Sequence, residues 1–269
     1  ASPEFDEKVA RQRMAAYGQL FRRIETAGKP VVGAATGTAL GGGLELLLAT
    51  HYRVVADVPA ARFGLPEVTL GLLPGAGGTQ RLPRLIGIAP SLPLLVEGRS
   101  LDARAAHMLG VVDEVVPAAE LLQAARAALQ GGKVDPVAAW DRPGFDLPGG
   151  DADSGDNAAA LSVAEAESVA RTHGNYPAPL AIMRALREGS SLPMDAALAL
   201  ELDLFMPLLR GRVSQNMIRT LFYSIGGANR LADAEARGGL RHGAVSGHRG
   251  IRAVRRRGGA SGRRVAGGG

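Results

Sequence analysis

The chain has 269 residues, of which 46% are hydrophobic and only 4% aromatic, which suits one large domain, or a domain with an appendage, around an aliphatic core. Cysteine is absent, which excludes a disulfide framework and a thiolate metal site and is typical of cytoplasmic proteins. The net charge of +5 belongs to the C-terminus, because nine arginines and no acidic residue follow residue 236. The other 22 basic residues are outnumbered by 26 acidic ones, so the charge does not point to a nucleic-acid partner.

No apolar run reaches the length that spans a membrane, and no signal-peptide pattern occurs at the N-terminus. We therefore expect a cytoplasmic protein with no membrane span.

Strands and helices are expected to alternate in the first half of the chain, which indicates an α/β fold. A helix over residues 2–27 has Ser2 as its expected cap, and Gly28 and Pro30 end it. Ser100 is expected to cap a helix that Gly110 closes. The remaining expected elements are strands at 31–35, 53–56 and 111–116 and helices from residue 79 onward and over 120–129.

Composition changes after residue 130. The patterns predict a core at 1–130, a linker rich in Gly, Asp and Pro at 131–157, a helical segment at 158–236 and a disordered Arg/Gly-rich tail at 237–269. The helices expected in the third region are 158–171, 178–188 and 194–223, the last as one long amphipathic helix. Disorder is the favoured interpretation of the tail. A nucleic-acid-binding arm is disfavoured, because the tail lacks aromatic residues that stack on bases. A third hypothesis is that the tail is the product of a shifted reading frame.

The stretch Lys29–Thr50 (KPVVGAATGTALGGGLELLLAT) is the most informative in the sequence. Three glycines, ending at Gly43, lead into a helical pattern that is apolar on all sides except at Glu45. Glycines at a helix start allow free backbone N–H groups to face an anion. None of the residues three or four positions from Glu45 can pair with its charge, and a buried carboxylate of this kind is typical of a functional site.

A second carboxylate, Glu67, follows Pro66 in the segment FGLPE and precedes another glycine-rich turn, GAGG at 75–78. Two carboxyl groups in apolar surroundings can divide the acid and base roles, because burial and mutual repulsion separate their pKa values. Beside an oxyanion site they can add water across a double bond conjugated to a thioester carbonyl. Taken alone, Glu67 and both glycine turns also fit ordinary structural roles.

Other chemistries find little support in the sequence. The segment GAGGTQ lacks the last glycine of a dinucleotide fingerprint, no Walker lysine follows a glycine loop, and no nucleophile elbow occurs. The five histidines show no metal-ligand spacing, so no metal site is expected, and His51 and His107 are interpreted as structural.

The segments KPVVGAATGTALGGGLELLLATHYRVVAD and FGLPEVTLGLLPGAGGTQRLPRLIG resemble the signature of the enoyl-CoA hydratase/isomerase (crotonase) family. The resemblance covers about residues 29–116. Residues 135–232 resemble the end of the hydratase half and the helical linker of multifunctional fatty-acid oxidation proteins. The implied fold is a crotonase-like spiral of β-β-α turns, here partial, followed by a C-terminal helical segment.

The resemblance implies roles for individual residues. Glu45 resembles the acid that positions and activates water, and Glu67 the acid that exchanges the proton at the α-carbon. The backbone N–H of Gly42 resembles the second oxyanion donor, and Gly75 a contact near the catalytic water. Gly41 and Leu65 are further expected substrate contacts.

The implied activity is hydration of trans-2-enoyl-CoA in fatty-acid β-oxidation, with no cofactor beyond the coenzyme A that the substrate carries. The implied partners are an acyl-CoA thioester and either further copies of the chain or a thiolase, with no nucleic acid.

Two departures from the family are expected. The segment that supplies the first oxyanion donor has no counterpart before Lys29, so the core is expected to lack its first strands, and a dehydrogenase domain is absent. The alternatives to a hydratase are an enoyl-CoA isomerase and a non-catalytic fragment that acts only in assembly.

Overall fold

The computed structural model describes residues 6–132 and 134–224. The chain divides into two units at Gly226, and every element named below belongs to the first. The predicted tail at 237–269 lies outside the described residues. In the described ranges, no helix is long and apolar enough to cross a membrane.

The elements of the described residues are mostly short, and most strands are shorter than the helices that cover them. The strands are β1 (Val32–Ala35), β2 (Ala39–Leu40), β3 (Tyr52–Ala56), β4 (Phe63–Gly64), β5 (Ser100–Leu101) and β6 (Glu114–Val116). The α-helices are α1 (Glu7–Glu25), α2 (Gly42–Leu48), α3 (Gly78–Ile86), α4 (Ile88–Leu95), α5 (Ala103–Met108), α6 (Leu121–Gln130), α7 (Gly155–Thr172), α8 (Pro177–Gly189), α9 (Met194–Arg210) and α10 (Arg212–Ile218). Single turns of other helix types are η1 (Pro66–Leu70), η2 (Ala118–Glu120), η3 (Ala139–Asp141) and η4 (Arg219–Ser224).

The first sheet has β3 between β1 and β6, all parallel. Successive residues of β3 face opposite sides, as the pleat requires. Val54 packs against Leu121 and Ala125 of α6, whereas Val55 belongs to the main core. Both faces of the sheet are therefore covered at this strand, which explains why residues 54–56 of β3 are all apolar.

The second sheet sets the position of the acidic residues. Strand β4 lies between β2, to which it is parallel, and β5, to which it is antiparallel. The register pairs Leu40 with Gly64. Because parallel strands run in the same direction, the residues after each strand meet at one edge: the glycines that start α2, and Pro66 and Glu67 in η1.

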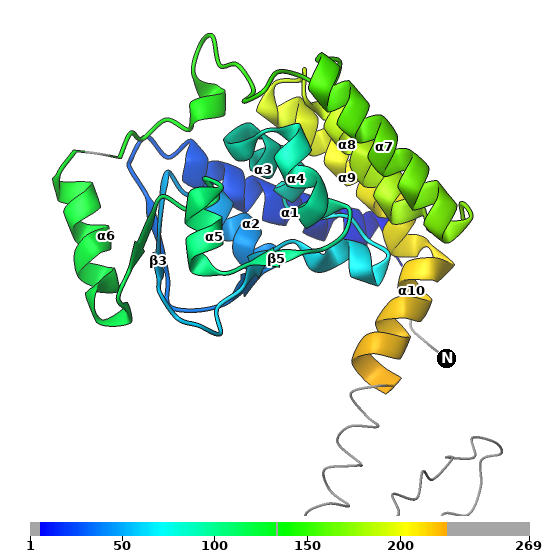
Figure 1. Ribbon diagram of the computed structural model, residues 1–269, viewed down its shortest axis with the longest axis horizontal. Coiled ribbons are helices and arrows are strands. Elements are labelled where there is room, and N and C mark those ends of the chain that lie inside the picture. The colour runs from blue at the N-terminus through cyan, green and yellow to red at the C-terminus, as the bar shows by residue number, and fades with distance from the viewer. Residues whose placement is uncertain (1–5, 133, 225–269) are drawn as a thin grey trace, which may run out of the picture. The chain divides into compact units, whose positions relative to one another are not determined.

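The C-terminal helices pack on the α/β part through α3 and α4 (Figure 1). Helix α8 packs against α3 and α9, α7 packs against α4 and α8, and α9 also contacts α1. Their buried apolar residues, such as Ile182 and Phe205, join the same core cluster as Leu44 and Leu82. The described helices therefore share one core with the sheets.

Two predicted helix starts were wrong. Helix α1 begins at Glu7, where the side chain of Asp6 accepts the N–H of Val9 at 3.0 Å, and Ser2 lies outside the described residues. Ser100 does not cap a helix, because it pairs with Gly64 in β5 and Asp102 caps α5 instead. In both places an aspartate satisfies an N–H group at the helix start.

The predicted long helix at 194–223 is also wrong. It breaks at Gly211, whose backbone is extended, with φ −66° and ψ 144°. The hydroxyl of Ser214 then donates to the carbonyl oxygens of Leu208 and Gly211, which closes the bend. The bend lets α10 pack against η1.

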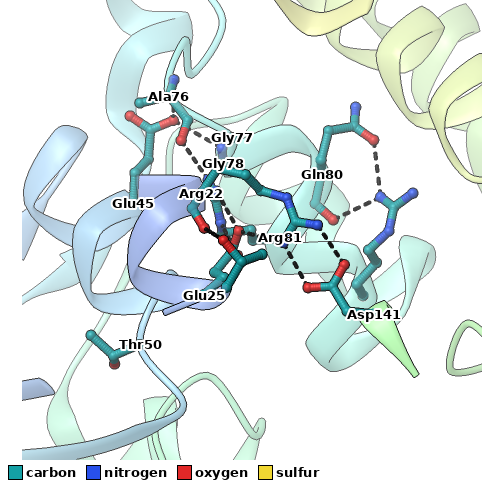
Figure 2. Close-up of polar contacts among 12 residues, drawn as sticks. Arg22, Glu25, Glu45, Thr50, Ala76, Gly77, Gly78, Gln80, Arg81 and Asp141 are labelled. Atoms are coloured by element: carbon teal, nitrogen blue, oxygen red, sulfur yellow. Dashed lines mark hydrogen bonds and ion pairs between the residues drawn. The ribbon is translucent and has the colours of Figure 1, made fainter. Parts of the chain in front are cut away.

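A buried ion pair joins α1 to α3. The guanidinium of Arg81 donates to both carboxylate oxygens of Glu25, at 2.6 and 3.0 Å, and the two side chains are 0% and 1% exposed. Arg22 lies between Glu25 and Asp141 and donates to both (Figure 2). Each charge therefore has a partner of opposite sign, which a buried charge requires.

We expect Glu25→Gln to lower the free energy of unfolding by about 3–5 kcal/mol, because it leaves the Arg81 cation buried without its carboxylate. Urea denaturation measures this loss. The control is Glu188→Gln, which breaks an exposed pair with Arg184 and should cost only about 0.3–0.5 kcal/mol. Equal effects of the two substitutions would contradict the interpretation of Glu25.

Candidate active site

The start of α2 presents free amide groups. Gly41 precedes the helix with φ 56° and ψ −130°, and its N–H donates to the carbonyl of Gly64 at 3.0 Å. Gly42 and Gly43 are exposed, and their N–H groups have no hydrogen-bond partner among the described residues. These amides lack a partner within the helix, as those of a first helical turn do, and the role of Gly42 as an oxyanion donor stays a prediction.

The carboxyl group of Glu45 is buried, and the residue is 3% exposed. Its Oε1 accepts the N–H groups of Ala76 at 2.7 Å and Gly78 at 2.8 Å, at the start of α3 (Figure 2). Glu45 is thus held by the second glycine turn and not by a residue of its own helix. Burial raises the pKa of Glu45, and the two amides and the charge of Arg81 oppose that rise.

Glu67 lies in η1, close to the glycines that start α2. A Cβ atom at Gly41 would lie 2.7 Å from Oε1 of Glu67, so a side chain at this position would displace that carboxyl group. Burial, and then the negative charge of Glu45, raise the pKa of Glu67 to about 8. Its Oε2 is buried without a hydrogen-bond partner among the described residues. The structure thus brings the two predicted acids together around the start of α2.

The other predicted contacts lie beside this pair. Leu65 is fully buried, and its Cδ1 would be 3.1 Å from a Cβ at Gly78. A Cβ at Gly75 would lie 2.9 Å from the ring of Phe205 and 3.1 Å from Met14. Gly75 therefore lets α9 and α1 approach the turn closely, and its role near a catalytic water stays a prediction.

Sequence reasoning missed another buried acid beside the turn, Glu201 of α9, which is 1% exposed. It accepts the N–H groups of Gly77 at 2.6 Å and Thr79 at 3.0 Å. Burial, and then the charge of Glu45, raise the pKa of Glu201 to about 8. The signal that identified Glu45 was also present here, since Glu201 has apolar residues on either side along its helix.

A cavity of about 280 Å³ lies on the same side of the turn as Glu201. Helices α1 and α9 and the turn line it, with mainly apolar side chains such as Met14, Leu198 and Leu202. The cavity is large enough and apolar enough for part of a small organic ligand.

His51 is structural, as predicted. Its Nδ1 accepts the N–H of Val31 at 3.1 Å, and its Nε2 lies 3.1 Å from the carbonyl oxygen of Glu25. The ring ties the end of α1 to β1. Across the described part of the chain, no group of three or more acidic or histidine side chains is placed to hold a metal ion.

The fold and the site define a class of protein: a crotonase-like α/β fold in which a buried acid, Glu45, and a half-buried acid, Glu67, lie near a helix start. Residues 6–134 match the family model described as enoyl-CoA hydratase/isomerase. The chain belongs to the enoyl-CoA hydratase/isomerase family.

The relatives include fatty acid oxidation complex subunits alpha of Vibrio. The subunit from Vibrio vulnificus (strain CMCP6) is 40% identical over 232 residues, 86% of this chain and 32% of that protein. The subunit from Vibrio cholerae serotype O1 (strain ATCC 39315 / El Tor Inaba N16961) is 41% identical over 214 residues, 79% of this chain and 30% of that protein. The chain thus spans about a third of the length of these relatives.

Among solved structures, one from Streptomyces avermitilis assigned as an enoyl-CoA hydratase matches with a TM-score of 0.52 and 28% identity. The match covers 85% of this chain and 68% of that chain.

We expect Gly41→Ala to displace Glu67 and to lower the free energy of unfolding by about 1–3 kcal/mol, because the backbone conformation is strained for alanine. The control Gly43→Ala adds a methyl group with no neighbour within 4 Å and should stabilise the helix by about 0.5–1 kcal/mol. Urea denaturation of the two variants measures both effects. Wild-type stability of Gly41→Ala would contradict the role given to this glycine.

Proposed function

We propose that this chain is an enoyl-CoA hydratase, which adds water to trans-2-enoyl-CoA and gives 3-hydroxyacyl-CoA in fatty-acid β-oxidation. The observation that carries the proposal is the approach of Glu67 to Gly41 at the start of the helix that bears Glu45, beside the free amide of Gly42.

The two acids have different surroundings, which supports different roles. Burial raises the pKa of Glu45, whereas its two amide hydrogen bonds and the charge of Arg81 favour its ionised form. Glu67 has a buried oxygen without a partner and a pKa of about 8, so it is protonated near pH 7. Glu45 is therefore the base that accepts a proton from water, and Glu67 is the acid.

In the proposed step, the water oxygen bonds to the β-carbon while its proton passes to Glu45. The electron pair of the double bond shifts toward the thioester carbonyl, whose oxygen accepts the N–H of Gly42. Glu67 then gives its proton to the α-carbon, and the carbonyl re-forms. One water is consumed. A proton then passes from Glu45 to Glu67, which returns both acids to their starting states.

The presence of two acids favours hydration over isomerisation. An isomerase can work with one base, which removes a proton from one carbon of the substrate and returns it to another. Neither Glu45 nor Glu67 lines the cavity on the Glu201 side of the turn, so the proposal gives that cavity no part in the reaction.

The partner proposed for the chain is either a second copy or a thiolase. The relatives from Vibrio are subunits of a complex, which supports an assembled state. A cytoplasmic location stays a prediction.

We expect Glu45→Gln and Glu67→Gln each to lower kcat for hydration of crotonyl-CoA by about 10²–10⁴-fold, because each removes a proton-transfer group. Loss of the enoyl absorbance measures the rate. The matched control is Glu97→Gln, an exposed carboxylate paired with Arg99, which should leave the rate unchanged.

Unchanged rates in both site variants would exclude the two-acid mechanism. A folded wild-type chain that leaves crotonyl-CoA unchanged would exclude the proposed activity and favour the non-catalytic alternative.

The pH dependence follows from Glu67. Because its pKa is raised to about 8, the acid is protonated below that pH and loses its proton above it. We expect kcat/KM for hydration to fall about tenfold per pH unit above pH 8. Initial rates between pH 6 and pH 10 measure this fall of kcat/KM, and the residual activity of Glu67→Gln should not show it. A flat profile to pH 10 would show that Glu67 is not the acid.

A further inference from the structure

The turn that holds Glu45 is bound from two opposite sides. Four successive N–H groups, from Ala76 to Thr79, donate alternately to two buried carboxyl groups. Those of Ala76 and Gly78 go to Glu45, and those of Gly77 and Thr79 go to Glu201. The hydroxyl of Thr79 also contacts Glu201.

We propose that Glu201 is a positioning residue: it fixes the amides of Gly77 and Thr79 so that those of Ala76 and Gly78 stay directed at Glu45. The inference rests on the proposed function only for its kinetic test. Glu201 does not touch the reacting atoms in this proposal, because it lies across the turn from Glu45.

The turn needs this support because its backbone is unusual. Gly77 has φ 102°, and a Cβ there would meet Arg81 and Leu198. Removing the hydrogen bonds of Glu201 would leave two buried N–H groups without partners, which favours rearrangement of the turn. The carbonyl of Ala76 is held by Arg81 at 2.6 Å, so Arg81 supports the same turn from a third direction.

Glu201 acts through hydrogen bonds more than through charge. The charged groups that face it are Glu45 of α2 and Arg81 of α3. The negative charge of Glu45 favours the neutral form of Glu201 near pH 7. Glutamine has the shape of that acid and keeps one of its two acceptors: its oxygen can accept the N–H of Gly77, whereas its amide group can donate to the hydroxyl of Thr79 but cannot accept the N–H of Thr79. Leucine has a similar volume and can do neither.

The test compares Glu201→Leu with Glu201→Gln. We expect Glu201→Leu to lower kcat for crotonyl-CoA by about 10²-fold at nearly unchanged KM, because Glu45 is displaced while the substrate contacts remain. Glu201→Gln should lose less of the rate than Glu201→Leu, because it keeps the hydrogen bond to Gly77. Independently of activity, hydrogen exchange of the Ala76 and Gly78 amides should be faster in Glu201→Leu than in Glu201→Gln.

The matched control is Leu208→Ala, which removes buried packing from the same helix away from the turn. It should lower the Tm without lowering kcat. Wild-type exchange at Ala76 and Gly78 in Glu201→Leu, or an equal loss of kcat in Leu208→Ala, would overturn the positioning role. If the wild-type chain does not hydrate crotonyl-CoA, the proposed activity fails, and the exchange comparison still decides the role of Glu201.

Discussion

The structure depends on the burial of carboxyl groups against the backbone amides at the start of α3. A carboxylate removed from water is strongly destabilising unless donors replace the lost hydration. Here the donors are consecutive N–H groups at a helix start, where the helix dipole adds positive potential. Arg81, buried behind them, supplies the opposite charge. The hydrogen bonds that offset the burial of Glu45 and Glu201 also join α2 and α9 to α3. The same contacts therefore hold these helices together and position the site.

The sequence was enough to find Glu45, because the residues on every side of it along its helix are apolar. It was also enough to place Glu67 near a glycine turn, and the resemblance of the two segments to one family predicted the fold. Glu201 carries the same local signal in the run LALELDLF, within the helix predicted at 194–223. A lone acid among apolar helical neighbours therefore identifies candidates in both helices.

Other features depend on residues distant in the sequence and could not be predicted from local patterns. The partners of Glu45 come from a segment 31 and 33 residues away, and no helical spacing indicates them. Ser100 has the propensity of a cap, yet pairing with Gly64 draws it into a strand. The break at Gly211 is set by packing, since α10 turns onto η1 where Tyr176 also donates to the carbonyl of Val68. The roles of Leu65 and Gly75 toward a substrate remain predictions.

The distance along the chain between Glu201 and Gly77, 124 residues, has a consequence for synthesis. A nascent chain emerges from the ribosome in order, and contacts of large sequence separation form late because loop closure costs entropy. A chain released as far as α8 already contains Glu45, Glu67 and both glycine turns, but two of the four amides lack their carboxyl group. The hydrogen bonding of the turn that holds Glu45 is therefore complete only when α9 is made, so a ribosome stalled before Met194 would carry the family signature with the amides of Gly77 and Thr79 still unpaired.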